Sequence, residues 1–444
     1  MKRYIITGVK KLKGDVYVSG SKNVVLKTVI AACLTSEVVE IKNVPLISDF
    51  FVILELVREI GGDVVLSGHT VKIHVPHIKT VKLPLEIGAK IRTSSMFLAP
   101  LLARNKEAFI PNPGGCRIGA RPIDRHIEGL EKMGAKISYH TEDGYFYAKT
   151  DGLCGANYTF EKNSHTGTET LIMAAVLAKG KTIIDNAAEE PEVDDLIGFL
   201  VSMGAKIERT ATRTIVIEGV TALHGTTYEI MPDRNEVVTF AICSALTGGG
   251  IIIKNAQLKD LDTFLLYFKN AGGEWEEKDG GVRFFIKDMI VPVNVTTGPH
   301  PGFMTDWQGA WAVLMTQSVG TSLIHETVYE NRFSYIGELE KMGAKIEFLM
   351  PSVKNPEKVY NFNYEHDKKN EYRQEVRIKG KTPFHNAVLT IADLRAGATI
   401  VLAALIATGE SVIFGIEHLE RGYEAFDSRL ASIGVDIDVV EEKI

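Results

Sequence analysis

The sequence predicts an α/β protein of two lobes, built from six repeats of about 70 residues with three repeats in each lobe. Three features carry this prediction: a short pattern that recurs six times, a long apolar helix in every unit, and a polar loop that leads into each amphipathic helix. The chain has 444 residues, more than one compact domain usually holds. We therefore expect a first lobe over residues 22–230, which carries the loop around Cys116. Residues 1–21 and 231–444 are expected to form the second lobe.

The recurring pattern is the end of an amphipathic helix, then a glycine, then a strand. It reads LVREIGGDV at residues 56–64 and LEKMGAKI at both 130–137 and 339–346. Glycine suits the left-handed backbone position that ends a helix, so each central glycine should turn the chain from a helix into a strand. These glycines are Gly61, Gly134, Gly204, Gly272, Gly343 and Gly434. Residues 1–8 also have the character of a short strand.

Each unit carries a second helix that is apolar nearly all round, as helices buried inside a domain are. The six segments are residues 23–34, 93–103, 168–178, 237–246, 309–319 and 397–407. A continuous solenoid is the alternative to two lobes. Units of this length with a fully apolar helix favour closed three-fold packing.

The last repeat contains an insertion. The spacing from Gly343 to Gly434 is 91 residues, about 20 more than the others, and the excess falls within residues 351–380. This stretch is polar and mixed in charge, which favours a solvated hairpin or loop. A lid or a partner contact is the other interpretation.

Bulk composition excludes several classes of protein. The net charge of -6 gives no global basic field for nucleic acid. No apolar stretch of 18 residues suggests a membrane span, and the N-terminus does not read as a signal peptide. The four cysteines have no metal-binding spacing, and Cys33 and Cys243 fall in apolar helices as buried thiols. We expect a cytoplasmic protein that needs no metal or other cofactor and binds neither nucleic acid nor membrane.

Cations at the starts of the buried helices point to an anionic ligand. Lys22, Arg92, Arg234 and Arg395 each fall in a first helical turn, where a cation opposes the helix dipole. Helix N-termini are natural phosphate sites, and arginine adds bidentate recognition of phosphate or carboxylate. The loops add Arg117, Arg121, Arg125, Arg332 and Arg421. We expect most of these groups to meet in one cationic cleft for a small, multiply anionic substrate, and some, Arg117 and Arg125 first, to pair with surface carboxylates.

Cys116 differs from the other cysteines because it lies in the loop PNPGGCRIGARP, between Arg117 and Arg121. Neighbouring cations stabilise a thiolate, and a loop position leaves the thiol accessible. One interpretation is a general acid or nucleophile, and the other is an incidental cysteine.

These residues resemble the UDP-N-acetylglucosamine 1-carboxyvinyltransferases of the enolpyruvyl transferase superfamily. The resemblance covers almost the whole chain and rests on several segments in order: SGSKN, GGCRIGARPID, AAVLAKG, NAAEEPE, PDR, TDWQ, ENRF, DLRAGA and RGYE. It implies an inside-out α/β barrel of two lobes with substrates bound between them. It also implies transfer of the enolpyruvyl group of phosphoenolpyruvate to the 3′-hydroxyl of UDP-N-acetylglucosamine, the first committed step of peptidoglycan synthesis.

The resemblance also implies roles for residues of this chain. Cys116 would protonate or add to the enolpyruvyl group, and Asp306 would take the proton of the sugar hydroxyl. Lys22, Arg121 and Arg421 would hold the phosphate of phosphoenolpyruvate, with Arg332 and Arg395 near its carboxylate. Lys22 and Arg395 therefore join Cys116 and Asp306 as catalytic residues. The sugar-nucleotide pocket would be lined by Asn23, Arg92, Arg121, Pro122, Ile123, Asp124, Arg125, Lys162, Ser164, Asp306 and Val328.

One segment departs from the family pattern. Residues 164–168 read Ser-His-Thr-Gly-Thr where the family usually has Ser-Val-Gly-Ala-Thr, on the side expected to face the nucleotide. A divergent paralogue with another sugar-nucleotide acceptor, and a non-catalytic binding protein on the same fold, are therefore alternatives. The intact Lys22, Cys116, Asp306 and Arg395 favour an enzyme. Enolpyruvylshikimate-phosphate synthase fits less well, because it lacks the GGC loop.

Overall fold

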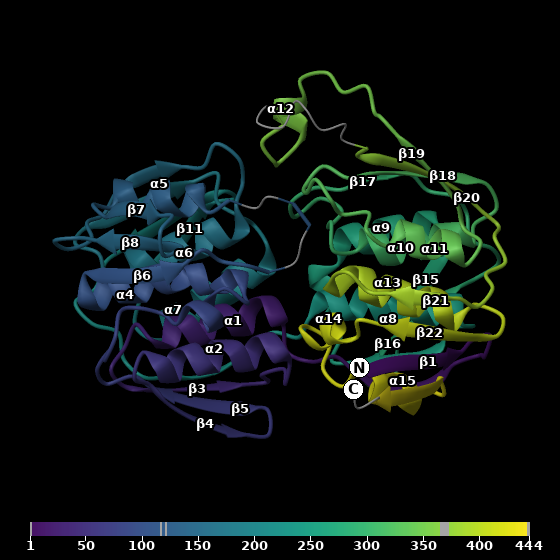
Figure 1. Ribbon diagram of the computed structural model, residues 1–444, viewed down its shortest axis with the longest axis horizontal. Coiled ribbons are helices and arrows are strands. Elements are labelled where there is room, and N and C mark those ends of the chain that lie inside the picture. Colours follow the sequence, from purple (N-terminus) through teal and green to yellow (C-terminus); the bar gives the residue numbers. More distant parts are fainter. Residues whose placement is uncertain (1, 116–117, 120–121, 365–372, 442–444) are drawn as a thin grey trace. The chain divides into compact units, whose positions relative to one another are not determined.

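The protein is described by a computed structural model that covers residues 2–115, 118–119, 122–364 and 373–441 (Figure 1). The chain forms two compact units. Unit 1 comprises Met1–Ser19, Cys116–Arg121 and Pro232–Ile444, and unit 2 comprises Gly20–Gly115 and Pro122–Met231. The short segment 118–119 is tied to unit 1, since the Asn331 amide donates to the Ile118 carbonyl at 3.1 Å.

Unit 2 contains three sheets around a helical centre. The sheets have the strand orders β13-β3-β5-β4, β6-β8-β7 and β11-β12-β10-β9. The strands are β3 (Val38–Lys42), β4 (Asp63–Ser67), β5 (Thr70–His74), β6 (Glu107–Pro111), β7 (Lys136–His140), β8 (Tyr145–Lys149), β9 (Asn157–Thr159), β10 (Lys181–Asp185), β11 (Lys206–Ala211), β12 (Thr214–Glu218) and β13 (Thr227–Glu229). The helices are α1 (Lys22–Ala32), α2 (Ser48–Glu59), α3 (Leu85–Gly88), η1 (Arg92–Phe97), α4 (Leu98–Asn105), α5 (Asp124–Lys132), α6 (His165–Ala175) and α7 (Pro191–Ser202).

Unit 1 repeats this arrangement. Its sheets have the orders β15-β16-β14-β2, β17-β18-β20-β19 and β21-β22-β1-β23. The strands are β1 (Lys2–Thr7), β2 (Lys13–Tyr17), β14 (Gly250–Lys254), β15 (Gly273–Lys278), β16 (Gly281–Ile286), β17 (Val295–Thr296), β18 (Thr321–His325), β19 (Lys345–Leu349), β20 (Glu375–Lys379), β21 (Val388–Thr390), β22 (Glu410–Phe414) and β23 (Asp436–Glu441). The helices are α8 (Arg234–Leu246), η2 (Leu258–Asp260), α9 (Asp262–Asn270), α10 (Gln308–Thr316), α11 (Ile336–Lys341), α12 (Pro356–Val359), α13 (Leu394–Leu405), α14 (Glu417–Glu420) and α15 (Phe426–Ser432).

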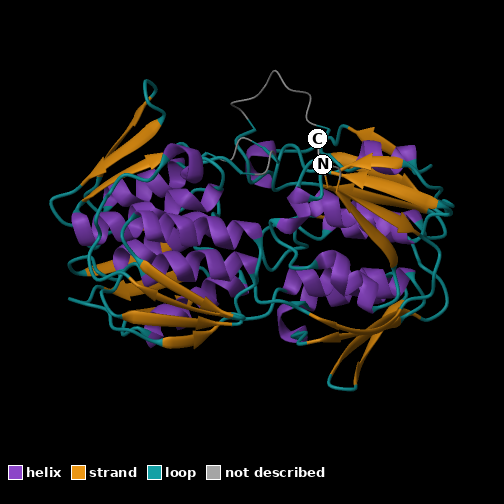
Figure 2. Ribbon diagram, turned by 60° about the horizontal axis from the view of Figure 1, so that its bottom comes forward, coloured by secondary structure: helices purple, strands orange, loops and turns teal. Residues whose placement is uncertain are grey.

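The six sheets follow one plan. In each, three antiparallel strands are joined at one edge by a short parallel partner; the three-stranded sheet has only a parallel bridge there, between Lys82 and Phe109. The N-terminal strand β1 lies antiparallel between β22 and β23 and so completes the last sheet of the chain. Within each unit the helices are central and the sheets lie outside them (Figure 2), which is the arrangement of an inside-out α/β barrel. The predicted six-repeat α/β fold is confirmed.

Local chemistry explains the regularity of the repeats. All six predicted helix-ending glycines have positive φ, between 87° and 102°, which is the left-handed region that favours glycine. The six apolar segments form buried helices. The second one is interrupted: residues 92–97 are 3₁₀, and α4 then begins at Leu98. Pro100 lies in the first turn of α4, where its missing N–H leaves no hydrogen bond unmade.

The insertion matches the expected solvated hairpin or loop in part, since β19 and β20 pair antiparallel and none of residues 351–359 is buried. Its last residues form β20, which lies between β18 and β19 in their sheet, but Tyr360 and Phe362 are buried. Tyr360 stacks on Phe362 and on Tyr364, and its hydroxyl lies 3.1 Å from Nε2 of His325 on β18. The expectation was wrong for this part because it counted charges and overlooked three aromatics that can stack on one another.

Across the described ranges, no helix is both long enough and apolar enough to cross a membrane.

Candidate functional site

Asp306, whose side chain is 22% exposed, is the centre of a charge cluster with two nearly buried arginines in unit 1. It lies two residues before α10, and one carboxylate oxygen accepts a hydrogen bond from Nη2 of Arg332. The other oxygen accepts from Nη2 of Arg395 at 3.3 Å. The structure therefore brings together three predicted site residues, from the segments that precede α10 and α11 and from the first turn of α13.

The two arginines are held by further partners. Nη1 of Arg332 lies 3.8 Å from Asp393, and Nη1 of Arg395 donates to the Tyr423 hydroxyl at 3.1 Å. Burial disfavours the charged form of each guanidinium. The nearby carboxylates outweigh burial for Arg332, and Tyr423 and Asp306 outweigh it for Arg395. The pKa values of both side chains are therefore raised. Both side chains stay cationic at any physiological pH.

The start of α13 explains how Arg395 is positioned. Asp393 is the N-cap of this helix and accepts the backbone amides of Arg395 and Ala396 at 3.0 and 3.1 Å. Its second oxygen accepts from Ser334 at 2.7 Å. The capping carboxylate thus fixes the helix end and offsets the positive charge that follows it.

Glu326 orders the loop that holds Val328. Its side chain is fully buried and accepts the Val328 and Tyr329 amides at 2.7 and 3.1 Å, and the Thr305 hydroxyl at 2.8 Å. Burial raises its pKa, and these hydrogen bonds oppose the rise. Sequence reasoning missed Glu326, although a carboxylate directly after an apolar strand is a signal that could have marked it.

In unit 2 the first turns of several helices carry predicted binding residues. Lys22 begins α1, and its ammonium lies 2.7 Å from Asp49 of α2, with both side chains about nine-tenths buried. Asn23 follows Lys22, and Arg92 begins η1. A nearly buried lysine with a matched carboxylate has a fixed position and a compensated charge.

The starts of α5 and α6 are tied together. Pro122 and Ile123 precede α5, which begins at Asp124, and Arg125 donates to the Asn163 carbonyl at 3.0 Å. Burial lowers the pKa of Arg125, and nearby carboxylates oppose this. Ser164 is the N-cap of α6 and accepts the Gly167 amide at 3.1 Å. Lys162 lies two residues earlier, in the same connection between β9 and α6.

The remaining predicted residues lie either outside the described residues or elsewhere along the chain. Cys116, Arg117 and Arg121 lie outside the described residues. Arg421 follows the short helix α14. Cys33 and Cys243 are buried as predicted, and burial raises the pKa of each thiol to about 12, which makes them inert at neutral pH.

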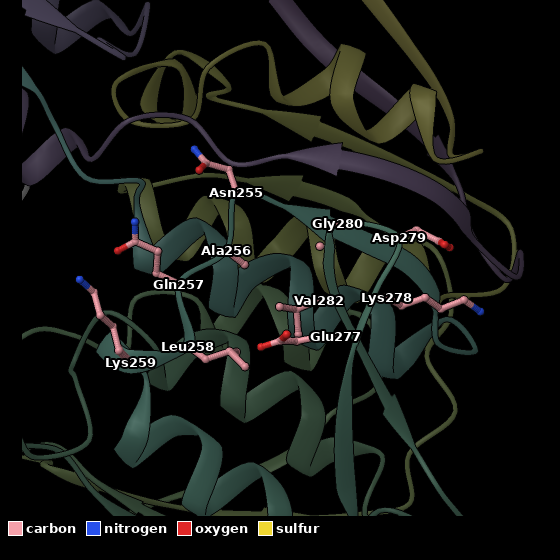
Figure 3. A pocket seen from close by; sticks show the side chains of 11 residues that line it. Asn255, Ala256, Gln257, Leu258, Lys259, Glu277, Lys278, Asp279, Gly280 and Val282 are labelled. Atoms are coloured by element: carbon pink, nitrogen blue, oxygen red, sulfur yellow. The ribbon is translucent and has the colours of Figure 1, made fainter.

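A separate hollow lies in unit 1, with a volume of about 810 Å³ (Figure 3). It is lined by the loop Asn255–Lys259 and by residues 277–282 of the β15–β16 hairpin. None of the predicted site residues lines it. Within the described ranges, no group of three or more His, Cys, Asp and Glu side chains has the arrangement of a metal site.

The fold is that of the enolpyruvyl transferases. Over 100% of this chain and 99% of the other, the structure superposes with a TM-score of 0.85 and 23% identity on the enolpyruvyl transferase NikO from Streptomyces tendae. An EPSP synthase from Acinetobacter baumannii superposes with a TM-score of 0.74 and 17% identity, over 99% of this chain and 100% of that one.

Sequence comparison defines the family further. Residues 6–430 match the model for EPSP synthase (3-phosphoshikimate 1-carboxyvinyltransferase), so the chain belongs to this family. Among its relatives, the UDP-N-acetylglucosamine 1-carboxyvinyltransferase of Koribacter versatilis is 40% identical over 100% of this chain and 97% of its own length. The protein of the same name from Magnetococcus marinus is 39% identical over 98% of this chain and 99% of its own length.

Proposed function

We propose that this protein transfers the enolpyruvyl group of phosphoenolpyruvate to the 3′-hydroxyl of UDP-N-acetylglucosamine and releases phosphate, a step of peptidoglycan synthesis. Full-length relatives about 40% identical to this chain carry the name of that activity. The observation that carries the proposal is Asp306, a carboxylate held between the guanidinium groups of Arg332 and Arg395. The same arginines offer planar donors that match a substrate carboxylate.

The proposed reaction has two steps. Asp306 takes the proton of the 3′-hydroxyl while the sugar oxygen bonds to C2 of phosphoenolpyruvate and C3 gains a proton. The tetrahedral product then loses phosphate from C2 and a proton from C3, which restores the double bond. Arginines fixed in advance stabilise charge that develops along this path, because they need not reorganise during the reaction.

The remaining predicted residues take supporting roles in this proposal. Lys22, held by Asp49, would bind the phosphate together with Arg121 and Arg421. Cys116 would supply the proton to C3 or add to the enolpyruvyl group. Pocket residues for the sugar nucleotide would be Asn23, Arg92, Arg121, Pro122, Ile123, Asp124, Arg125, Lys162, Ser164, Asp306 and Val328.

We also propose a cytoplasmic location. Cys33, Cys154 and Cys243, the described cysteines, are free, and Cys154 is exposed. Exposed thiols persist in reducing compartments.

Phosphate release tests the proposed function. The protein is mixed with phosphoenolpyruvate and UDP-N-acetylglucosamine, and released phosphate is followed over time. Release that requires both substrates supports the transferase. No release from folded protein that binds the sugar nucleotide would favour a binding protein, and release with another acceptor alone would favour a divergent paralogue.

A second test concerns Cys116. The resemblance implies that the epoxide fosfomycin alkylates this thiol, so Cys116→Ser should abolish labelling detected by intact-protein mass and impair turnover. Cys154→Ser is the matched control, because Cys154 is the exposed thiol among the described cysteines. Equal labelling of wild type and Cys116→Ser would remove Cys116 from the site.

A further inference from the structure

Three titratable side chains meet at the helical centre of unit 2: Lys27 and Glu169 are buried, and His165 is 23% exposed. Lys27 of α1 lies 3.3 Å from one oxygen of Glu169 on α6, and Nε2 of His165 lies 3.2 Å from the other. The Glu169 side chain is fully buried, and that of Lys27 is 4% exposed. Buried charged groups need partners of opposite charge, so the three side chains form one charge network.

Both ends of this charge network reach predicted binding residues. The Lys27 ammonium donates to the backbone carbonyl of Asn23, in the first turn of α1. His165 is the first residue of α6 and directly follows the N-cap Ser164. A continuous path therefore runs from Asn23 through Lys27, Glu169 and His165 to Ser164, and joins the starts of two helices.

Protonation of His165 would offset the carboxylates that surround it. Two carboxyl groups, those of Glu169 and of Glu190 before α7, and one amine, that of Lys27, act electrostatically on His165. Within the described residues, neither oxygen of Glu169 has a partner with hydrogen-bond geometry, so its carboxylate depends on the ion pairs. A neutral His165 would leave Lys27 as the one cation at 3.3 Å from this buried carboxylate among the described residues.

The surroundings of His165 favour its charged form. Burial and Lys27 oppose protonation, as does the N-terminal end of α6, where His165 lies. Glu169 and Glu190 favour protonation, and the pKa of His165 is raised. Helix α5 packs nearby, and Nε2 of its His126 lies 3.0 Å from the hydroxyl of Thr166. His126 thus contacts the next residue along α6.

We propose that Lys27, Glu169 and His165 are positioning residues that hold the first turns of α1 and α6 in place for the sugar nucleotide, with protonated His165 as the member that responds to pH. This inference rests on the proposed function. The network acts through Asn23 and Ser164, so its loss should weaken acceptor binding and leave the donor and the chemical step nearly unchanged.

Steady-state kinetics from pH 6 to 9 test this inference. For the wild type, the KM for UDP-N-acetylglucosamine should rise as the pH passes through the raised pKa of His165. His165→Asn should raise that KM by about tenfold at low pH and make it independent of pH, with kcat and the KM for phosphoenolpyruvate within about twofold. His165→Lys should restore a low KM that no longer depends on pH, because lysine keeps its charge.

Controls separate the possible failures. His224→Asn, which changes an exposed histidine of unit 2, should keep the wild-type pH profile. Thermal unfolding shows that each variant is folded, and Glu169→Gln gives a second disruption of the network with the same expected KM effect. If folded His165→Asn and Glu169→Gln both keep the wild-type KM and profile in an active enzyme, the inference is wrong. A wild type without turnover or acceptor binding overturns the proposed function instead, and the acceptor role of the network with it.

Discussion

The two units share one architecture but are stabilised by different buried charges. In unit 1, Asp306 lies between Arg332 and Arg395. In unit 2, the corresponding helical centre uses Lys27 and His165 around Glu169, and Lys22 with Asp49. The two clusters therefore differ in their cations, which are arginines in unit 1 and lysine and histidine in unit 2.

The difference has a chemical consequence. Arginine is always charged and presents a rigid planar fork, whereas lysine is a flexible point charge and histidine titrates near neutrality. The two arginines of unit 1 therefore keep their charge at any physiological pH. The cluster of unit 2 includes a histidine, His165, whose pKa is raised from its ordinary value. One repeat fold can thus carry a permanent charge cluster in one copy and a pH-dependent one in the other.

The largest expected effect comes from removing the carboxylate of unit 1. Asp306→Ala should lower turnover by about 10²–10⁴-fold, because it removes the proposed base and releases Arg332 and Arg395 from their partner. Sugar-nucleotide binding should be partly retained in calorimetry. Asp436→Ala, which removes an exposed partner of Lys10, is the control and should leave turnover unchanged. Unchanged turnover in Asp306→Ala would refute the role assigned to this carboxylate.

Replacing one arginine tests whether unit 1 depends on the planar fork as well as on charge. Arg395→Lys keeps the charge but loses parallel donors, so the KM for phosphoenolpyruvate should rise by about ten- to a hundredfold. Arg377→Lys changes an exposed arginine paired with Glu347 and should have no kinetic effect. An equally silent Arg395→Lys would mean that charge alone suffices in unit 1.

Removing the lysine from the buried network of unit 2 should also lower stability, in addition to the effect on acceptor binding. Lys27→Met leaves Glu169 with one cationic partner in the interior, which costs about 3 kcal/mol in the free energy of unfolding. Denaturant unfolding measures this, and Lys10→Met is the matched control. Its ion pair is exposed, so the unfolding midpoint should hardly move. Similar midpoints for the two variants would show that the buried network does not stabilise unit 2.

The smallest effect compares one histidine from each unit. The pKa of His165 is raised, so its stabilising contribution is present at low pH and is lost as the pH rises through that pKa. Burial of His325 lowers its pKa, with Glu375 opposing, so its contribution is present at high pH and is lost as the pH falls.

The unfolding free energies of His165→Asn and His325→Asn, measured from pH 5 to 8, check this pair. The loss of unfolding free energy in His165→Asn should become smaller as the pH rises, whereas the loss in His325→Asn should become larger. Parallel pH dependences for the two variants would contradict the contrast between the units.

By itself, the sequence determined the repeat and its local structure. The helix-ending glycines, the buried apolar helices and the cations in first helical turns follow from rules that act within a few residues. Lys27 and Glu169 also left a signal, as charges inside otherwise apolar helices, although only the structure shows that they meet.

Only the tertiary structure decided which charges pair. Asp306 contacts arginines that follow it by 26 and 89 residues, and Lys27 contacts a carboxylate from another repeat. The N-terminal strand β1 likewise pairs with strands at the C-terminal end of the chain. No local rule selects such partners, because a buried charge can be neutralised by any opposite charge that the packing of the helices brings within reach.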